Sequence, residues 1–362
     1  MLPSLSAREK GALGTRVTIQ DIADELGLSR NTVSKALNNA GGIADETRAR
    51  IIQKAMEMGY KQFAYASAIL AAQQDRHMDA LLVGSQPGGE IALLSASFLG
   101  GSHFASLTLD WFQNEITKLG FTLGMHRVTE NHLADCRLPI TFRRECVTAI
   151  ICFEMFDKVY DDMLCQLGIP ILFVDGPAKV DGKSLPADQL YMDNTTGITQ
   201  LVNDMLAVGR TRIGFIGNYR HCQSFYERYA AFRLAMLLAG VPVEDRFCIE
   251  ENKMVGIAPR LEQLDELPDV FVCANDFVAL DALQVMRGLG YDVPRDVWLT
   301  GFDDSSESRN CMPRLTTVHI HTQVMAFSAV QLLRTRLREP SLDYRQLHTE
   351  TTLIYRESTP LS

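Results

Sequence analysis

Apolar and polar positions follow two different periods along the chain, and the change falls near residue 90. Residues 17–60 carry apolar side chains three and four positions apart, the spacing of one helix face. Residues 91–362 show short apolar runs of strand length, which alternate with amphipathic helical stretches. A polar tail, 1–16, precedes the first region, and a polar, Gly-rich stretch, 73–90, leads into the second. The pattern predicts a small all-α head and a larger α/β body.

The head contains a helix–turn–helix pattern. Thr18 is a suitable N-cap for a first helix over 19–26, and Gly27 supplies the left-handed residue that a sharp turn needs. A second helix over 30–37 follows a three-residue turn, and a third spans 45–58. In this arrangement the second helix enters the major groove of DNA.

The outward side of the second helix carries the side chains that read bases. Arg30 can grip the O6 and N7 atoms of guanine, and Asn31 can grip the N6 and N7 atoms of adenine. Lys35 suits a base or a phosphate. The alternative is an ordinary solvated helix face. The glycine turn, the cap and the N-terminal position together favour DNA recognition.

The body alternates strands with helices. Buried strands of this kind predict parallel sheets that are covered on both faces, with a ligand cleft at the carboxyl ends of the strands. The expected strands are 91–98, 121–128, 149–155, 169–177, 212–217, 269–276 and 296–304, and the expected helices are 104–119, 159–167, 226–239 and 277–289.

Composition and charge add three constraints. The 362 residues exceed what one hydrophobic core usually fills, so several domains are expected. The net charge is −9, yet residues 1–76 hold ten Lys and Arg against eight Asp and Glu, so a mildly basic head joins an acidic body. Eight cysteines without a CxxC pair, no signal-peptide core and no membrane-length apolar run favour a cytoplasmic protein with reduced thiols and no membrane partner.

Two consecutive segments resemble the lactose/galactose-repressor (LacI/GalR) family of bacterial transcriptional regulators: VTIQDIADELGLSRNTVSKALN and ADETRARIIQKAMEMGY. The body is similar to that family's core, which resembles periplasmic sugar-binding proteins with two parallel-sheet subdomains. The segments that carry this second resemblance are YMDNTTGITQLVNDMLAVGRTRIGFIG, SFYERYAAFRLAMLLAG, CANDFVALDALQVMRGLGYDVPRDVWLTGFDDS, PRLTTV and LIYREST.

The resemblance implies a division of the chain. It gives a DNA-binding domain over 17–60, a hinge and linker over 61–90, and an effector-binding and dimerisation domain over 91–362. Within the last, the N-subdomain is expected at 91–208 with 319–349, and the C-subdomain at 209–318 with 350–362. A homodimer on a palindromic operator is implied, with the helix 104–119, including Trp111 and Phe112, as dimer surface.

The resemblance also implies roles for residues of the head. Arg30, Asn31 and Lys35 fall at base-reading positions. The residues at phosphate-holding positions are Thr18, Ser29, Thr32, Ser34 and Asn38. Ile69 falls where the family places a minor-groove wedge, although its usual Pro and Arg are missing from 61–70. The alternative is a helix that packs on the body.

Effector contacts carry over to the body in the same way. The matching positions are Arg228, Asp303, Asp193, His103, Phe104, Asn275, Asp276 and Ser224. The planar fork of Arg228 suits a ligand hydroxyl or carboxylate, and Asp303 would accept from ligand hydroxyl or N–H groups. Alternatively, Arg228 pairs with a nearby carboxylate and Asp303 caps a helix.

Other motifs are set aside. The stretch 176–184 has five residues between its glycines and a Pro, so it fails as a phosphate loop. His319 and His321 share one face of a strand, but no third metal ligand suggests itself. No metal, cofactor or enzymatic activity is therefore expected.

The sequence thus predicts a regulator, a repressor by expectation, that responds to a sugar-like effector. A nucleobase or phosphosugar effector is the alternative. Two other classes compete with it. A solute-binding receptor would use only the body, and a sugar kinase with a DNA-binding head would need a phosphate loop.

Overall fold

The computed structural model describes residues 17–37, 43–58, 89–96 and 103–361. The chain divides into two units, Met1–Gln86 and Pro87–Ser362, and each is described by itself. The predictions made for Asn38 and Ile69 lie outside the described residues.

Three short helices form the first unit: α2 (Ile19–Leu26), α3 (Arg30–Leu37) and α4 (Asp45–Glu57). Thr18 begins α2 with a capping box, in which Thr18 and Asp21 each accept a hydrogen bond from the other's backbone N–H. Gly27 ends α2 with a φ of 65°, the left-handed conformation that lets the chain turn into α3. The helices bury Ile22, Ala23, Val33, Ala36, Ile51 and Ala55 between them. The predicted helix–turn–helix head is confirmed.

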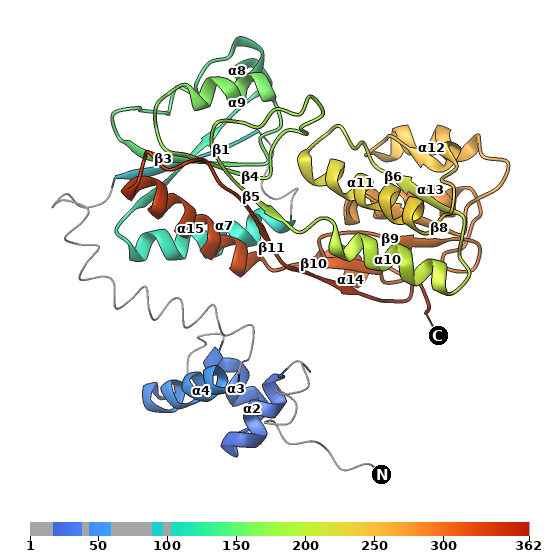
Figure 1. Ribbon diagram of the computed structural model, residues 1–362, viewed down its shortest axis with the longest axis horizontal. Coiled ribbons are helices and arrows are strands. Elements are labelled where there is room, and N and C mark those ends of the chain that lie inside the picture. The colour runs from blue at the N-terminus through green and yellow to red at the C-terminus, as the bar shows by residue number, and fades with distance from the viewer. Residues whose placement is uncertain (1–16, 38–42, 59–88, 97–102, 362) are drawn as a thin grey trace. The chain divides into compact units, whose positions relative to one another are not determined.

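The second unit contains two lobes. The first lobe is built on a six-stranded sheet in the order β11-β5-β4-β3-β1-β2, in which every neighbouring pair is parallel. Its strands are β1 (Glu90–Ser95), β2 (Thr122–Arg127), β3 (Val147–Phe153), β4 (Ile171–Val174), β5 (Asp188–Met192) and β11 (Gln346–Thr349). Its helices are α7 (His103–Lys118), α8 (Glu130–Asp135), α9 (Lys158–Cys165) and α15 (Thr322–Arg338). The helices α7 and α15 pack together on one face, and α8 and α9 lie on the other (Figure 1).

The second lobe is built on a four-stranded parallel sheet in the order β7-β6-β8-β9. Its strands are β6 (Ile213–Ile216), β7 (Cys248–Ile249), β8 (Val270–Cys273) and β9 (Trp298–Thr300). Its helices are α10 (Thr196–Ala207), α11 (Gln223–Leu238), α12 (Met254–Glu262), α13 (Asp276–Gly288) and α14 (Ser306–Asn310), with a short 3₁₀ turn at Asp245–Phe247. Two parallel α/β layers confirm the predicted fold class.

Three connections join the lobes. The first runs from β5 to α10 and the second from β10 (Thr317–Ile320) to α15. The third runs from β11 to β12 (Thr351–Ile354), and β12 pairs antiparallel with β10. The second and third connections are thus tied to each other, because β10, which precedes the second, is hydrogen-bonded to β12, which follows the third.

The boundary expected at 208/209 is wrong. The helix α10 packs against α11 and β12, so it belongs to the second lobe (Figure 1). The chain therefore crosses before this helix, between Asp193 and Thr195, where Asp193 caps its first turn. Gly209 ends α10 with a φ of 82°; the sequence shows this helix stop plainly, but a stop is not a domain boundary. His319 of β10 also belongs to the second lobe, because it forms a β-bridge with Asp303.

The prediction that Trp111 and Phe112 of α7 form a dimer surface also needs correction. Phe112 has no exposed surface and lies in the core of the first lobe, so it cannot form a dimer surface. Trp111 is partly buried against the same core. Leu107, on this helix, is 40% exposed and offers surface instead.

Candidate functional site

The first candidate site lies on α3. Val33 and Ala36 face the core of the head, and Arg30, Asn31 and Lys35 are exposed. This division follows from the helix period, because the buried residues occupy one side of two turns and the exposed residues the other. The three side chains predicted to read bases are therefore accessible together.

Hydroxyl groups around this helix have structural partners. Ser29 Oγ accepts from the Thr32 backbone N–H over 3.0 Å and lies 2.8 Å from Thr32 Oγ1. Thr18 Oγ1 donates to Asp21 over 2.8 Å. Ser34 is half-buried on α3. A capping hydroxyl sits at a helix N-terminus, where backbone N–H groups attract phosphate, so capping and phosphate contact are compatible.

The second candidate site lies where the two lobes meet, and Arg228 is at its centre. This residue of α11 is 2% exposed. Its Nε donates to Asn194 Oδ1 over 2.9 Å and its Nη1 donates to the Ala274 carbonyl over 2.7 Å. The guanidinium stacks on Phe302, 3.5 Å from the ring centroid. No described residue accepts a hydrogen bond from Nη2, which leaves one donor nitrogen for a ligand.

Asp303 faces this arginine without a close partner. Its Oδ1 lies 3.7 Å from Arg228 Nη1, and among the described residues no group donates a hydrogen bond to its carboxylate. Its backbone has a φ of 114°, a strained conformation for a residue with a side chain. Burial raises the pKa of Asp303 well above its usual value, against the opposing effect of Arg228. Asp303 does not cap a helix; Ser305 caps α14.

Asp175 joins the lobes and was missed in the sequence. It follows β4 in the first lobe, and its Oδ1 accepts from the Gly176 N–H over 2.9 Å and from the Ser224 N–H of α11 over 3.3 Å. Burial raises the pKa of Asp175 as well. The available signal was its position after a buried parallel strand, where such sheets place ligand-binding groups.

A second layer of contacts crosses between the lobes. The Gln223 N–H donates to the Gly176 carbonyl over 2.9 Å, and Gln223 Oε1 accepts from the Lys179 N–H over 2.9 Å. Glu227 accepts from Asn194 Nδ2 over 2.8 Å. The first turns of α11 are thus held by the loop after β4.

Three of the other predicted effector contacts, Asp193, Asn275 and Asp276, have structural partners. Asp193 Oδ1 accepts from the backbone of Thr195 and Thr196 at the start of α10. Asn275 Oδ1 caps α13 through Val278. Asp276 is buried, and its carboxylate accepts hydrogen bonds from the Ser305 N–H over 2.7 Å and from Thr317 Oγ1 over 2.6 Å. His103 and Phe104 form the first residues of α7.

His319 and His321 lie together on β10. Their ring centroids are 4.9 Å apart, with His319 Nδ1 2.9 Å from Asp304 Oδ2 and His321 Nε2 3.0 Å from Thr352 Oγ1. Within the described residues, no group of three or more His, Cys, Asp or Glu side chains could hold a metal ion. Within the same part of the chain, no helix is long and apolar enough to cross a membrane.

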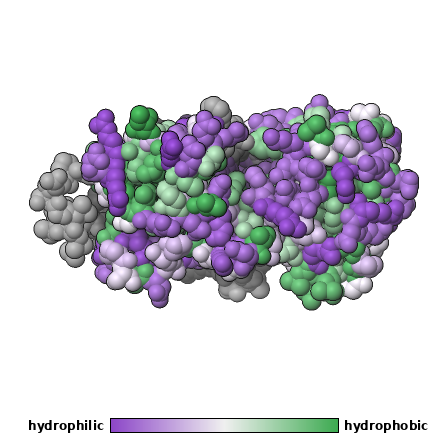
Figure 2. Space-filling view, turned by 90° about the horizontal axis from the view of Figure 1, so that it is seen from above, coloured by the Kyte–Doolittle hydropathy of each residue, from purple (hydrophilic) through white to green (hydrophobic). Residues whose placement is uncertain are grey.

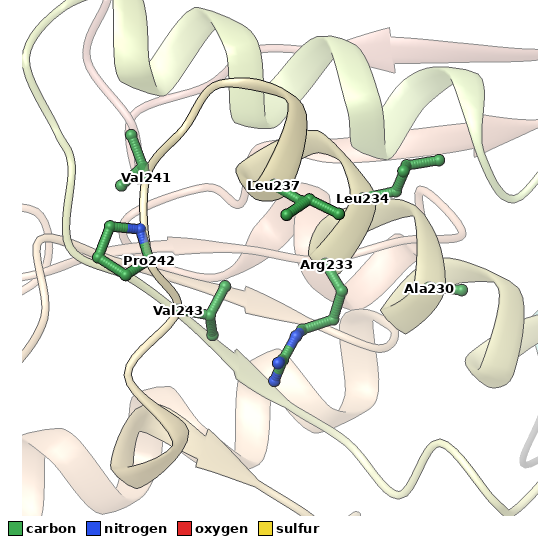
Figure 3. Close-up of a pocket in the computed structure, with 7 residues that line it drawn as sticks. All are labelled: Ala230, Arg233, Leu234, Leu237, Val241, Pro242 and Val243. Carbon is green, nitrogen blue, oxygen red and sulfur yellow. The ribbon is translucent and has the colours of Figure 1, made fainter.

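A separate pocket of about 390 Å³ lies at the C-terminal half of α11. Figure 3 shows the side chains that line it, which are Ala230, Arg233, Leu234, Leu237, Val241, Pro242 and Val243. The lining is apolar except for Arg233, whose Nη1 is paired with Asp245 over 2.8 Å. Because it offers few polar groups to orient a ligand, the junction of the lobes is the better candidate.

Comparisons with known proteins agree with both parts of the structure. Residues 18–62 match the family described as bacterial regulatory proteins, lacI family, and residues 202–359 match the periplasmic binding protein-like domain. The transcriptional regulator CelR of Thermobifida fusca is 26% identical over 351 residues, which cover 95% of this chain and 98% of that protein. The regulator GalR of Lacticaseibacillus casei is 26% identical, with 94% of this chain and 99% of that protein covered.

Solved structures share the fold. A complex of CelR with cellobiose has a TM-score of 0.64 at 22% identity, covering 95% of this chain and all of that one. A lac repressor dimer bound to operator and the anti-inducer ONPF has a TM-score of 0.61 at 19% identity, covering 95% and 99%. The matched head, the matched body and relatives that cover nearly the whole length agree. The chain carries a DNA-binding domain of the lacI family and a periplasmic binding protein-like domain, and its relatives over nearly the whole length are LacI/GalR-type transcriptional regulators, not enzymes.

Proposed function

We propose that this regulator binds a palindromic operator as a homodimer, acts as a repressor in the cytoplasm and responds to a small sugar-like effector. Arg30, Asn31 and Lys35 read bases, and Thr18, Ser29, Thr32 and Ser34 hold phosphates. The exposure of the first three on one face of α3 supports these roles. Two heads, one from each subunit, would engage half-sites about one duplex turn apart.

The observation that carries the effector proposal is the contact between Asp175 and the first turn of α11. Asp175 belongs to the first lobe and Ser224 to the second. A ligand that bound between them and engaged Arg228 and Asp303 would change how the lobes meet. It would shift the balance between DNA-binding and released states by its difference in affinity for the two.

A sugar is the favoured effector class. The free Nη2 of Arg228 and the unbonded carboxylate of Asp303 offer one donor and one acceptor, which suits adjacent hydroxyl groups. The CelR structure contains cellobiose, and another structure with the same fold contains ribose. A nucleobase or phosphosugar effector remains the second candidate.

Exposed apolar side chains support a dimer of the second unit. Leu234, Leu237 and Leu238, which lie close together at the end of α11, are 54%, 72% and 78% exposed. Figure 2 shows hydrophobic side chains gathered at one edge of the half of the molecule that holds the second lobe. Apolar surface of this kind is typical of protein interfaces.

Selection of bound duplexes from a random DNA pool, near physiological salt, tests this function. Enrichment of one palindrome is the expected result. A bound set with no shared sequence would reduce the head to charge-driven binding. A solute-binding receptor would bind a sugar and select no sequence at all. The centre of the palindrome would also show whether the operator is kinked, as a wedge at Ile69 requires.

A further inference from the structure

Three carboxylates gather at the junction of the lobes, and each follows a strand of a parallel sheet. Glu154 follows β3, Asp175 follows β4, and Asp303 lies just beyond β9. All three residues have a positive φ, at 50°, 55° and 114°. Backbone strain of this kind persists where surrounding structure enforces it, and it concentrates at ligand sites. The strain points to a placement that serves binding.

The charges near Asp303 are mostly negative. Glu154, Asp175 and Asp276 all act against its ionisation, and Arg228 is the cation that favours it. Arg228 is already engaged by Asn194 and the Ala274 carbonyl, and its charge also rests on the Phe302 ring. Its distance to Asp303, 3.7 Å, exceeds that of a hydrogen bond. Arg228 therefore leaves the carboxylate of Asp303 without a hydrogen bond from a described residue.

We propose that the effector carries a protonated amine beside its hydroxyl groups, as an amino sugar does, and that Asp303 and Asp175 receive the amine. This rests on the proposed function, because it names the ligand class of the same site. An ammonium group would satisfy the carboxylate of Asp303 and relieve the repulsion among its neighbours. A phosphate or carboxylate at this place would add to that repulsion, so this proposal, unlike the second candidate above, predicts that a phosphosugar does not bind.

The test measures affinity of the full chain for matched ligand pairs by titration calorimetry, at about pH 6.5, where an amine is protonated. The probes are glucosamine against glucose, and the β-1,4-linked dimer of glucosamine against cellobiose. Glucose 6-phosphate is the anionic probe. In at least one pair, the amine member should bind about tenfold more tightly or better, since a charged hydrogen bond replaces a neutral one. The anionic probe should not bind.

Two variants identify the groups responsible. Asp303→Asn and Asp175→Asn keep the shape of the side chains and remove their charge, so each should bring the affinity ratio of the pair towards one. Asp162→Asn removes an exposed carboxylate of the first lobe and should preserve the ratio. Circular dichroism and thermal unfolding of the three variants would show that they fold.

The inference is overturned if the neutral member binds as tightly in every pair, if the phosphate binds, or if no amine probe binds. Binding of a neutral sugar that depends on Asp303 would leave the proposed function in place. It would overturn only the proposal that the effector carries an amine. Failure of the regulator itself would show separately, as the absence of any selected DNA sequence.

Discussion

Asp175 of the first lobe caps a helix of the second: its Oδ1 accepts from the Ser224 N–H, in the first turn of α11, over 3.3 Å. The N-cap residue of that helix, Cys222, makes no side-chain cap of its own. A helix N-terminus that lacks a local cap is thus completed by a carboxylate from another part of the fold. The carboxylate of Asp175 therefore contributes both to the stability of α11 and to the docking of the lobes.

Asp175→Ala should lower the free energy of unfolding by about 1 kcal/mol, the usual cost of a lost helix cap. It should also speed amide hydrogen exchange at Ser224. Asp157→Ala is the matched control, because Asp157 caps α9 within the first lobe through Tyr160 over 2.9 Å. The control should speed exchange at Tyr160 and leave Ser224 unchanged. Equal effects of both variants at Ser224 would contradict a cap that spans the lobes.

Asp303→Ala should leave operator affinity unchanged and abolish release by the effector. The carboxylate makes no hydrogen bond to the described residues, so its removal breaks no internal contact except the long ion pair with Arg228. Operator release would be followed by fluorescence anisotropy over a ligand titration. Asp292→Ala, an exposed carboxylate of the second lobe, serves as control. An unaltered ligand response in the Asp303 variant would defeat this site.

Arg30→Ala should cost about 1–3 kcal/mol of discrimination between the operator and a variant operator with one changed base pair. The reason is loss of a two-point contact to a base. Arg50→Ala removes the same charge from an exposed position on α4 and should weaken binding to all DNA by a similar factor, or not at all. Equal loss of affinity for both operators in the Arg30 variant would make Arg30 a phosphate contact.

Asp161 should make the first lobe less stable as pH rises. This residue is fully buried on α9, its two oxygens have no partner, and burial raises its pKa to about 8. The folded chain therefore holds a proton that the unfolded chain releases above about pH 4, so stability falls between about pH 4 and pH 8. Asp161→Asn should remove this slope and add stability of the order of a few kcal/mol at about pH 8.

Urea unfolding across that pH range checks this prediction. Asp135→Asn is the control, since its side chain is exposed and forms a surface pair with Arg137. The control should keep the slope of the natural chain. A slope that survives in the Asp161 variant would mean that another group takes up the proton.

Asp304 should have the opposite effect, so that the second lobe becomes less stable as pH falls. Although burial acts against ionisation, hydrogen bonds from His319, Arg356 and Arg309 lower its pKa to about 2. Its contribution to stability is therefore complete above about pH 4, the unfolded value, and is lost as pH falls towards 2. Asp304→Ala should cost about 3–5 kcal/mol at neutral pH, because it leaves the guanidinium of Arg356, whose side chain is 12% exposed, without its carboxylate. Glu357→Gln, which removes an exposed pair with Arg314, should cost at most about 1 kcal/mol. Chemical denaturation at neutral pH distinguishes the two, and similar costs would contradict the burial argument.

Local signals in the sequence were enough to predict the head. Thr18 and Gly27 lie at the two ends of α2, so the beginning and the end of this helix can be predicted from adjacent residues. The alternation of strands and helices in the body is equally local. The first crossing between lobes was misplaced because α10 ends at a clear glycine stop, whereas its packing on α11 depends on residues elsewhere.

The candidate site was predictable only in part. Arg228 and Asp303 lie together as the resemblance implied. Asp193 and Asn275, in contrast, occupy cap positions, and a carboxylate or amide before a helix looks the same in a sequence whether it caps or binds. Asp175 was missed because its partner Ser224 is far along the chain, and the sequence contains no record of that pairing.

The place of β11 in the first sheet has a consequence for synthesis. This strand lies beside β5, and Asp188 of β5 is bound by Arg336 over 2.9 Å and by the Arg345 N–H over 2.9 Å. A ribosome makes β6 to β9 and α10 to α14 of the second lobe before it makes these partners. Throughout that interval the nascent first lobe has an open sheet edge and a carboxylate without its arginine, which invites pairing between neighbouring nascent chains. The native edge closes only when β11, the last strand of the first lobe, arrives.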